Sequence, residues 1–93
     1  MLSGPQEQVL EQPKLEEKTS ELRKIILWND EVNTFDWVIE SLVKVCEHTP
    51  EQAEQSAHIV HYKGKYAVKI GSLEDLKPRC EALLDRKLTA TIQ

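Results

Sequence analysis

The chain has 93 residues and a formal net charge of −4. This length allows a single domain with one modest hydrophobic core. The acidic balance and the lack of a cluster of Lys and Arg exclude the basic footprint that phosphate binding needs, so we expect no nucleic-acid partner. The sequence shows neither a signal peptide nor an apolar run near the length of a membrane span, so we expect a cytoplasmic protein without membrane contact.

The first 20 residues contain a glycine, two prolines and many Gln and Glu, but few large apolar side chains. We expect a flexible tail here, because the segment buries too little apolar surface to offset the entropy of ordering. A short helix that packs Leu10 and Leu15 against the body is the alternative. Residues 21–93 then form the core domain, and residues 22–28, which are rich in Ile and Leu, are predicted to be its first strand.

Two helices are predicted next. Thr34 or Asn33 can cap the first helix, which begins near Phe35. Its apolar face recurs at helical spacing and comprises Phe35, Val38, Ile39, Leu42, Val45 and Cys46. For the second helix, Thr49 can cap, Pro50 suits the first helical position and Gln52 can close a capping box. It should run to about Tyr62, with Gly64 as the left-handed residue that ends it and with an inward face made of Ala53, Ala57, Val60 and His61.

A strand, a third helix and a last strand complete the domain. Residues 65–70 alternate Tyr66, Val68 and Ile70 with Lys65, Ala67 and Lys69, which is typical of a strand with one solvent-exposed face. Ser72, with Asp75 three residues later, starts the third helix, whose stripe comprises Leu73, Leu76, Cys80, Leu83 and Leu84. Pro78 implies either a separate turn over residues 72–77 or a kink. Residues 88–92 alternate as a strand, so the prediction is an α/β fold of the α+β type, with a three-stranded antiparallel sheet packed against three helices.

The two cysteines, Cys46 and Cys80, each fall on the apolar stripe of a predicted helix, and neither belongs to a metal or redox motif. We expect both to be reduced, small core residues. Cys46, His48, His58 and His61 contain zinc-ligand types, but their spacing is not that of a paired ligand motif, so no metal or cofactor is expected.

A polar group stands at the end of the first strand. Asn29, Asp30 and Glu31 directly follow the apolar run, and their oxygens are acceptors suited to an ammonium group. His61 can complete this group of acceptors if it is neutral. Taken alone, the same three residues also fit a turn beside a helix start.

Two separated segments carry a family resemblance. Residues 27–30, Leu-Trp-Asn-Asp, and residues 59–65, Ile-Val-His-Tyr-Lys-Gly-Lys, resemble in order and spacing the ClpS family of adaptors, which deliver proteins with destabilising N-terminal residues to a Clp protease. The resemblance covers roughly residues 23–93. It implies that Asn29, Asp30 and His61 contact the α-amino group of a guest, with Asp30 stabilising the positive charge.

The resemblance also implies a pocket for the guest's first side chain, which would be Phe, Tyr, Trp or Leu. The matching positions are Phe35, Val38, Ala57, Val60 and Leu88. Phe35 stands where many members have a Met that rejects β-branched first residues, and Ala57 stands where a Met is common. We therefore expect aromatic guests to be accepted with an altered ranking.

The partner implied is a Clp-family AAA+ unfoldase of the ClpA or ClpC type, bound through its N-terminal domain. The positions matching the family's unfoldase contacts are Glu74 and Arg79, although exposed charges on a helix are often only a solvated face. The resemblance also implies that the N-terminal tail can engage the unfoldase while the guest protein is handed over. We expect the adaptor to be a monomer.

Other functions fit the residues less well. A generic interaction module, like the C-terminal domain of the ribosomal stalk protein, has the same layers but no use for an ammonium site. A hydrolase with His61 as base lacks a paired nucleophile and an oxyanion loop, so the chain is not expected to be an enzyme. The N-degron module of ubiquitin ligases uses similar residues, but nothing here supports ubiquitin transfer. Trp28 and Trp37 are interpreted as core or pocket-rim packing rather than as a cation cage.

Overall fold

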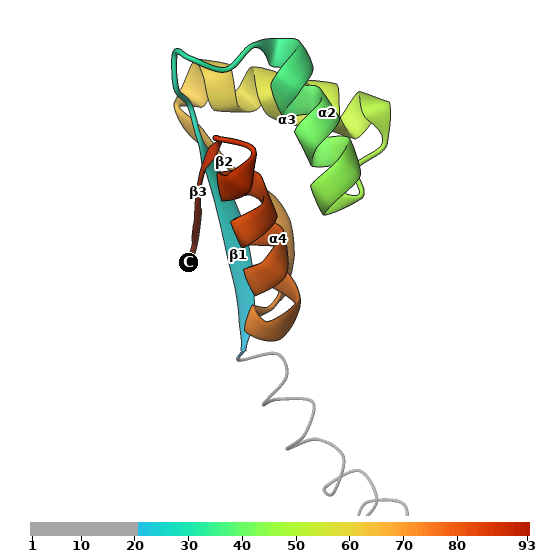
Figure 1. Cartoon of the computed structure of the whole chain (residues 1–93), viewed down its shortest axis with the longest axis vertical. Helices are drawn as coiled ribbons and strands as arrows, with labels where there is room; N and C mark the ends of the chain where they lie inside the picture. The colour runs from blue at the N-terminus through green and yellow to red at the C-terminus, as the bar shows by residue number, and fades with distance from the viewer. Residues whose placement is uncertain (1–20) are drawn as a thin grey trace, which may run out of the picture.

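The structure, a computed structural model, describes residues 21–93. This part of the chain forms three strands and three helices (Figure 1). In chain order the elements are β1 (Leu22–Trp28), α2 (Phe35–Cys46), α3 (Pro50–Lys63), β2 (Lys65–Ser72), α4 (Leu73–Asp85) and β3 (Thr89–Ile92). The predicted order of elements is confirmed. The predicted tail of residues 1–20, with its alternative helix, lies outside the described residues.

The strands form one antiparallel sheet in the order β2-β1-β3, with β1 in the centre. In Figure 1, α2 and α4 lie on the same side of β1. The core on this side is almost fully closed to solvent, and its largest members are Ile25, Leu27, Leu42, Leu76 and Leu83. The predicted three-stranded antiparallel sheet with three helices is therefore confirmed, and burial of these side chains is its main source of stability.

A β-bulge interrupts the pairing of β1 with β2. Ile25 pairs with Lys69 and Ile26 pairs with Ala67, so Val68 is an extra residue without a partner in the ladder. The bulge breaks the alternation of side chains along β2. As a result Val68 is 5% exposed but Ile70 is 59% exposed, and the prediction that both share one covered face with Tyr66 is wrong.

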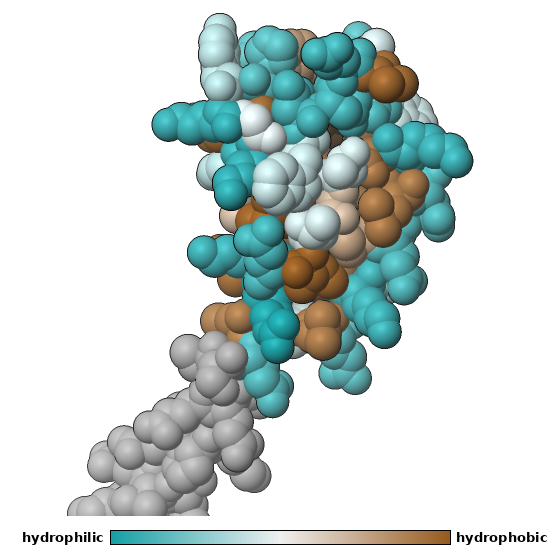
Figure 2. Space-filling view, turned by 90° about the vertical axis from the view of Figure 1, so that its left-hand side faces the viewer, coloured by the Kyte–Doolittle hydropathy of each residue, from teal (hydrophilic) through white to brown (hydrophobic). Residues whose placement is uncertain are grey.

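The other face of the sheet is partly apolar. Figure 2 looks onto the side of the molecule where β3 lies and shows apolar and weakly polar surface in the middle, with hydrophilic side chains around it. Ile26 pairs with Thr91, and the indole Nε1 of Trp28 donates to Thr91 Oγ1 at 3.0 Å. Lys65 Nζ lies 5.1 Å from the centroid of the Trp28 ring. These neighbours keep Ile26 buried on a face that no described helix covers.

The helix boundaries follow the predicted local signals. Thr34 caps α2 and accepts a hydrogen bond from Trp37 N at 3.1 Å. Thr49 caps α3 with a complete capping box to Gln52, and Gly64 ends this helix with φ of 90°. A left-handed φ is readily adopted by glycine because it has no Cβ.

Pro78 does not divide α4. Leu73–Asp85 is one helix whose cap, Ser72, accepts from Asp75 N at 3.1 Å, so the predicted separate turn is wrong. Without an N–H, Pro78 cannot donate the bond that Glu74 O would otherwise accept. The buried stripe is also narrower than predicted, because Leu73 and Leu84 are exposed.

Both cysteines are free and buried, as predicted. Burial raises the pKa of Cys46 to about 11 and also raises the pKa of Cys80, so both thiols stay protonated near neutral pH. No helix within residues 21–93 has the length and apolar character needed to cross a membrane.

Candidate functional site

A cavity of about 450 Å³ opens where the loop after β1, the start of α2, the end of α3 and the segment after α4 meet. Its lining comprises Leu27, Trp28, Asn29, Asp30, Glu31, Asn33, Thr34, Phe35, Val38, Ala57, Val60, His61 and Leu88. The three residues expected to bind an amine and the five expected to form a guest pocket are all in this lining. The fold thus brings together residues separated by up to 59 positions, from Asn29 to Leu88.

The cavity has an apolar part built from core-facing positions. Leu27 of β1, Ala57 and Val60 of α3, and Leu88 between α4 and β3 are buried, and Val38 of α2 is half-buried. Apolar walls of this kind favour an apolar side chain, because its burial removes hydrocarbon surface from water.

Phe35 lines the cavity, but it is more exposed than predicted. It is the first residue of α2 and was expected on that helix's covered face, but its side chain is 41% exposed. The reason is its place in the first turn, which stands beside the cavity rather than over the sheet. Its ring lies 5.0 Å from the His58 ring and 5.3 Å from the His61 ring, measured between centroids.

Leu88 reaches the cavity through the turn that ends α4. Lys87 adopts a left-handed φ of 73°, and its N–H donates to Leu84 O at 2.9 Å. Leu88 N donates to Leu83 O at 3.1 Å. This pair of bonds is the Schellman pattern of a helix end, here with a lysine where glycine is most common.

Asp30 is held firmly by its own loop. Its Oδ1 accepts from Val32 N and Asn33 N, both at 2.9 Å, and the Asn33 side chain donates to both carboxylate oxygens, at 3.1 and 2.9 Å. Partial burial pushes the pKa of Asp30 upward, but the hydrogen bonds from Asn33 and Val32 outweigh burial and lower the pKa below 3.8. Asp30 is therefore a charged acceptor near neutral pH.

Asn29 and His61 line the same cavity as this carboxylate. Asn29 N donates to Gly64 O at 2.9 Å, which ties the start of the loop to the end of α3. His61 was predicted on the inward face of α3, and this is wrong, because its side chain is exposed. It lies in the last turn of the helix, where Tyr62 and Lys63 are exposed as well.

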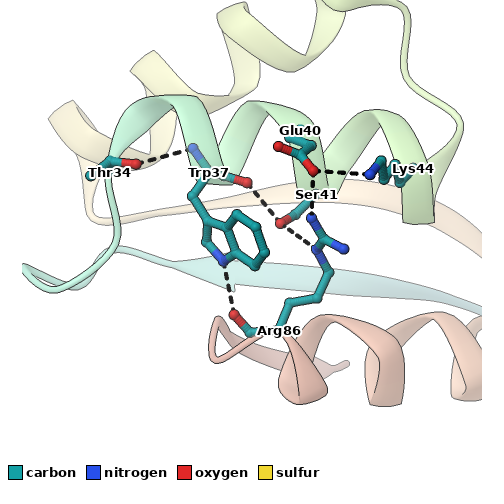
Figure 3. A network of polar contacts seen from close by, with 6 residues as sticks. All are labelled: Thr34, Trp37, Glu40, Ser41, Lys44 and Arg86. Carbon is teal, nitrogen blue, oxygen red and sulfur yellow. Dashed lines mark hydrogen bonds and ion pairs between the residues drawn. The ribbon is translucent and has the colours of Figure 1, made fainter.

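A polar network ties the segment after α4 onto α2 (Figure 3). The Arg86 guanidinium stacks 4.1 Å from the centroid of the Trp37 ring, and the indole Nε1 of Trp37 donates to Arg86 O at 2.9 Å. Arg86 Nε donates to Ser41 Oγ at 2.8 Å, and its Nη2 lies 3.3 Å from Glu40 Oε2. Trp37 also packs against the core, and Trp28 lines the cavity, as predicted, but each of them additionally has one cation over its ring.

Asn33 was predicted only as a candidate helix cap, but it also lies in the cavity wall. Its Nδ2 also donates to Lys87 O at 2.9 Å and so joins two segments that are 54 positions apart. The Asp-x-x-Asn spacing of Asp30 and Asn33 is a local signal for the turn. The contact with Lys87 has no local signal.

The two predicted unfoldase contacts do not form one patch. Glu74 is exposed in the first turn of α4. Arg79 lies five positions later, about 140° further around the helix. Its Nη1 donates to Val45 O at 2.7 Å and its Nη2 lies 3.4 Å from Asp75 Oδ1. Arg79 thus binds the end of α2.

The Cys and His residues of zinc-ligand type do not come together in the described residues. Within residues 21–93 no three His, Cys, Asp or Glu side chains are grouped to hold a metal ion. His48 instead places Nε2 2.7 Å from the carbonyl oxygen of the bulge residue Val68.

Comparison with known proteins assigns the chain to a family. The family model described as "ATP-dependent Clp protease adaptor protein ClpS" matches residues 18–91. The chain belongs to the ClpS family. The resemblance found in the sequence is thereby confirmed for most of the described residues.

Relatives and a solved structure agree with this assignment. ATP-dependent Clp protease adapter proteins ClpS of Campylobacter jejuni, from strains 81-176 and RM1221, are 42% identical over 60 residues, which is 64% of this chain and 60% of each relative. The match therefore spans less than two thirds of their length. The structure of Agrobacterium tumefaciens ClpS2 bound to L-phenylalaninamide superposes with a TM-score of 0.72 at 20% identity, covering 78% of this chain and 95% of the other, which shows a common fold.

Proposed function

We propose that this ClpS-family protein is a cytoplasmic, monomeric adaptor that binds proteins with a bulky hydrophobic N-terminal residue and presents them to a Clp-family AAA+ unfoldase. The observation that carries the proposal is one cavity with an apolar interior and a group of acceptors at its rim. A free N-terminus offers the matching chemistry, since it joins an ammonium group to a side chain on the same carbon atom.

Asp30, Asn29 and His61 would each accept a hydrogen bond from the ammonium group of the guest. Asp30 Oδ1 already accepts several N–H groups, but among residues 21–93 Oδ2 accepts only from Asn33, which leaves it a lone pair for an ammonium hydrogen. The fixed negative charge beside the cavity stabilises the cation in addition. The side chains of Asn29 and His61 make no hydrogen bond to another residue within the described part of the chain, so both are free to accept from the guest.

The apolar walls take the first side chain of the guest. Burying Phe or Leu supplies about 1.5–3 kcal/mol, and hydrogen bonds to a charged group supply roughly 1.5–3 kcal/mol each. After the costs of association, micromolar affinity for Phe, Tyr, Trp or Leu is expected. The phenylalaninamide in the name of the Agrobacterium structure has a free amine next to a benzyl side chain, which is the same combination.

The partner contacts are proposed on α4. An unfoldase of the ClpA or ClpC type would meet the exposed Glu74 through its N-terminal domain. Arg79, at 22% side-chain exposure, would contribute through the part of its guanidinium left open by Val45, Glu47 and Asp75.

Binding of short peptides measured by fluorescence anisotropy tests the recognition part of the proposal. Peptides beginning with Phe, Leu, Val or Met are compared with a free and with an acetylated N-terminus. We expect free Phe and Leu peptides to bind with micromolar Kd and acetylation to weaken binding at least about tenfold, because it removes the charge and two donors. His61→Ala should weaken binding, and Val32→Ala, a change at an exposed residue of the same loop, should not. If no free peptide binds, a generic interaction module becomes the better description.

A further inference from the structure

One aromatic side chain at the cavity is flanked by two histidines of the neighbouring helix. Phe35 lies with its ring centroid 5.0 Å from that of His58, at an interplanar angle of 41°. The His61 ring lies 5.3 Å away at 59°. The two histidines are three positions apart and so lie on the same side of α3. Such tilted contacts between rings are favourable geometries.

The two histidines differ in their relation to the cavity. His61 lines it together with Phe35, whereas His58 contacts Phe35 but does not belong to the lining. The contact that links His58 to the cavity is the one with the Phe35 ring. Ala57, the residue next to it on α3, is buried in the cavity wall and contributes only a methyl group. Phe35 and Ala57 both line the cavity, so the position of the Phe35 ring affects how much room a guest side chain has there.

Phe35 is 41% exposed, so the core holds its ring only in part. The position of the ring therefore depends on its contacts with the rings of His58 and His61. An exposed aromatic side chain without neighbours exchanges between rotamers, and ordering it on binding reduces affinity. A ring already fixed by a neighbour binds a flat aromatic guest without that cost.

We propose that His58 is a positioning residue that sets the guest preference of the cavity by holding the Phe35 ring in place. This inference rests on the proposed binding of N-terminal residues. Guests that contact the Phe35 ring face to edge, Phe, Tyr and Trp, gain from a fixed ring. Aliphatic guests make less directional contacts with the ring and gain less.

The test compares wild type, His58→Ala, His58→Phe and the control Gln55→Ala, which changes an exposed residue on the same helix. Binding of peptides beginning with free Phe, Trp and Leu is measured for each protein, together with its thermal unfolding. We expect His58→Ala to weaken Phe and Trp peptides by about 2- to 10-fold, to change Leu peptides less than about twofold, and to leave the effect of acetylation unchanged. His58→Phe restores a ring at the same place and should restore the aromatic preference, whereas Gln55→Ala should alter nothing.

Each alternative result has a defined meaning. If wild type binds free peptides but His58→Ala weakens all of them equally, or none of them, the positioning role is refuted and the proposed function stands. A His58→Phe protein that stays as unselective as His58→Ala also refutes it. If wild type binds no free N-terminal peptide, the proposed function fails and this inference fails with it. Side-chain NMR gives an independent readout, in which the Phe35 χ1 angle should be more averaged in His58→Ala, where the His61 ring remains beside it, than in wild type.

Discussion

Asn33 joins the loop after β1 to the segment after α4, and replacing it with alanine tests how strongly the cavity depends on this connection. Its Nδ2 contacts both Asp30 oxygens, at 3.1 and 2.9 Å, and Lys87 O at 2.9 Å. Because an amide nitrogen has two hydrogens, these contacts amount to about two hydrogen bonds, one of them to a charged acceptor. A charged acceptor contributes roughly 1.5–3 kcal/mol and a neutral one roughly 0.5–1.5 kcal/mol. Partial exposure reduces both, so we expect Asn33→Ala to lower the free energy of unfolding by about 2 kcal/mol.

Thermal and urea denaturation measure this loss. For a domain of this size, about 2 kcal/mol corresponds to a decrease in Tm of roughly 8–16 °C. The matched control is Val32→Ala, because Val32 is 87% exposed and contacts Asp30 only through its backbone N–H. This control should leave Tm nearly unchanged. A Tm of Asn33→Ala equal to that of the control would refute the reasoning that the amide connects the two segments.

The same substitution should change the titration of Asp30. The lowered pKa of this carboxyl, against the upward effect of burial, depends on bonds from Asn33 and Val32. An acid whose pKa is lower in the folded state stabilises the fold above its unfolded pKa, and this stabilisation is lost as the pH falls through the folded pKa. Wild type should therefore lose stability below about pH 4, and Asn33→Ala should lose less over that range. An NMR titration of the Asp30 carboxyl carbon should show a higher pKa in the variant.

Experiments on Arg86, Cys46 and Leu42 test other parts of the structure. Arg86→Ala should lower the free energy of unfolding by roughly 1–3 kcal/mol in urea denaturation, because the stack on Trp37 at 4.1 Å and a hydrogen bond to α2 are lost; wild-type stability would contradict this. The Cys46 thiol, 1% exposed, should react with a thiol reagent at pH 8 only as fast as the protein unfolds. Since its pKa is raised from 9.0 to about 11, the free energy of unfolding should also fall between those pH values. Leu42→Ala should cost about 2–5 kcal/mol by creating a cavity in the core, and Leu84→Ala, at an exposed site of α4, should cost much less.

The helix ends were predictable because their determinants are local. Thr49 and Gln52 lie three positions apart and contact each other, and Gly64 adopts the conformation for which glycine is suited. The β-bulge was not predictable in the same way. The position of Val68 depends on the register of β2 against β1, which are distant in sequence, and a plain alternation therefore assigned Ile70 to the wrong face.

The composition of the site was predictable through the polar group after β1 and the spacing to the second segment. Asn29, Asp30 and His61 do line one cavity, but their individual surroundings required the structure. Helical periodicity placed His61 inward, because periodicity does not show that the last turn of α3 projects beyond the core. It also could not show that Asn33 reaches Lys87, a contact across 54 positions that only the closed fold creates.

The cavity is built from both ends of the described chain, and this couples its occupancy to the docking of the last strand. β3 has four residues and lies at an edge of the sheet, and Leu88 immediately precedes it. When β3 detaches together with the turn before it, the cavity loses the Leu88 wall, so a guest binds the closed form and shifts the population toward it. At a peptide concentration 100 times Kd, this linkage adds about 2.7 kcal/mol to the free energy of unfolding. Amide hydrogens of β3 should then exchange more slowly with solvent, so that a guest held at one end of the domain protects the backbone of its final strand.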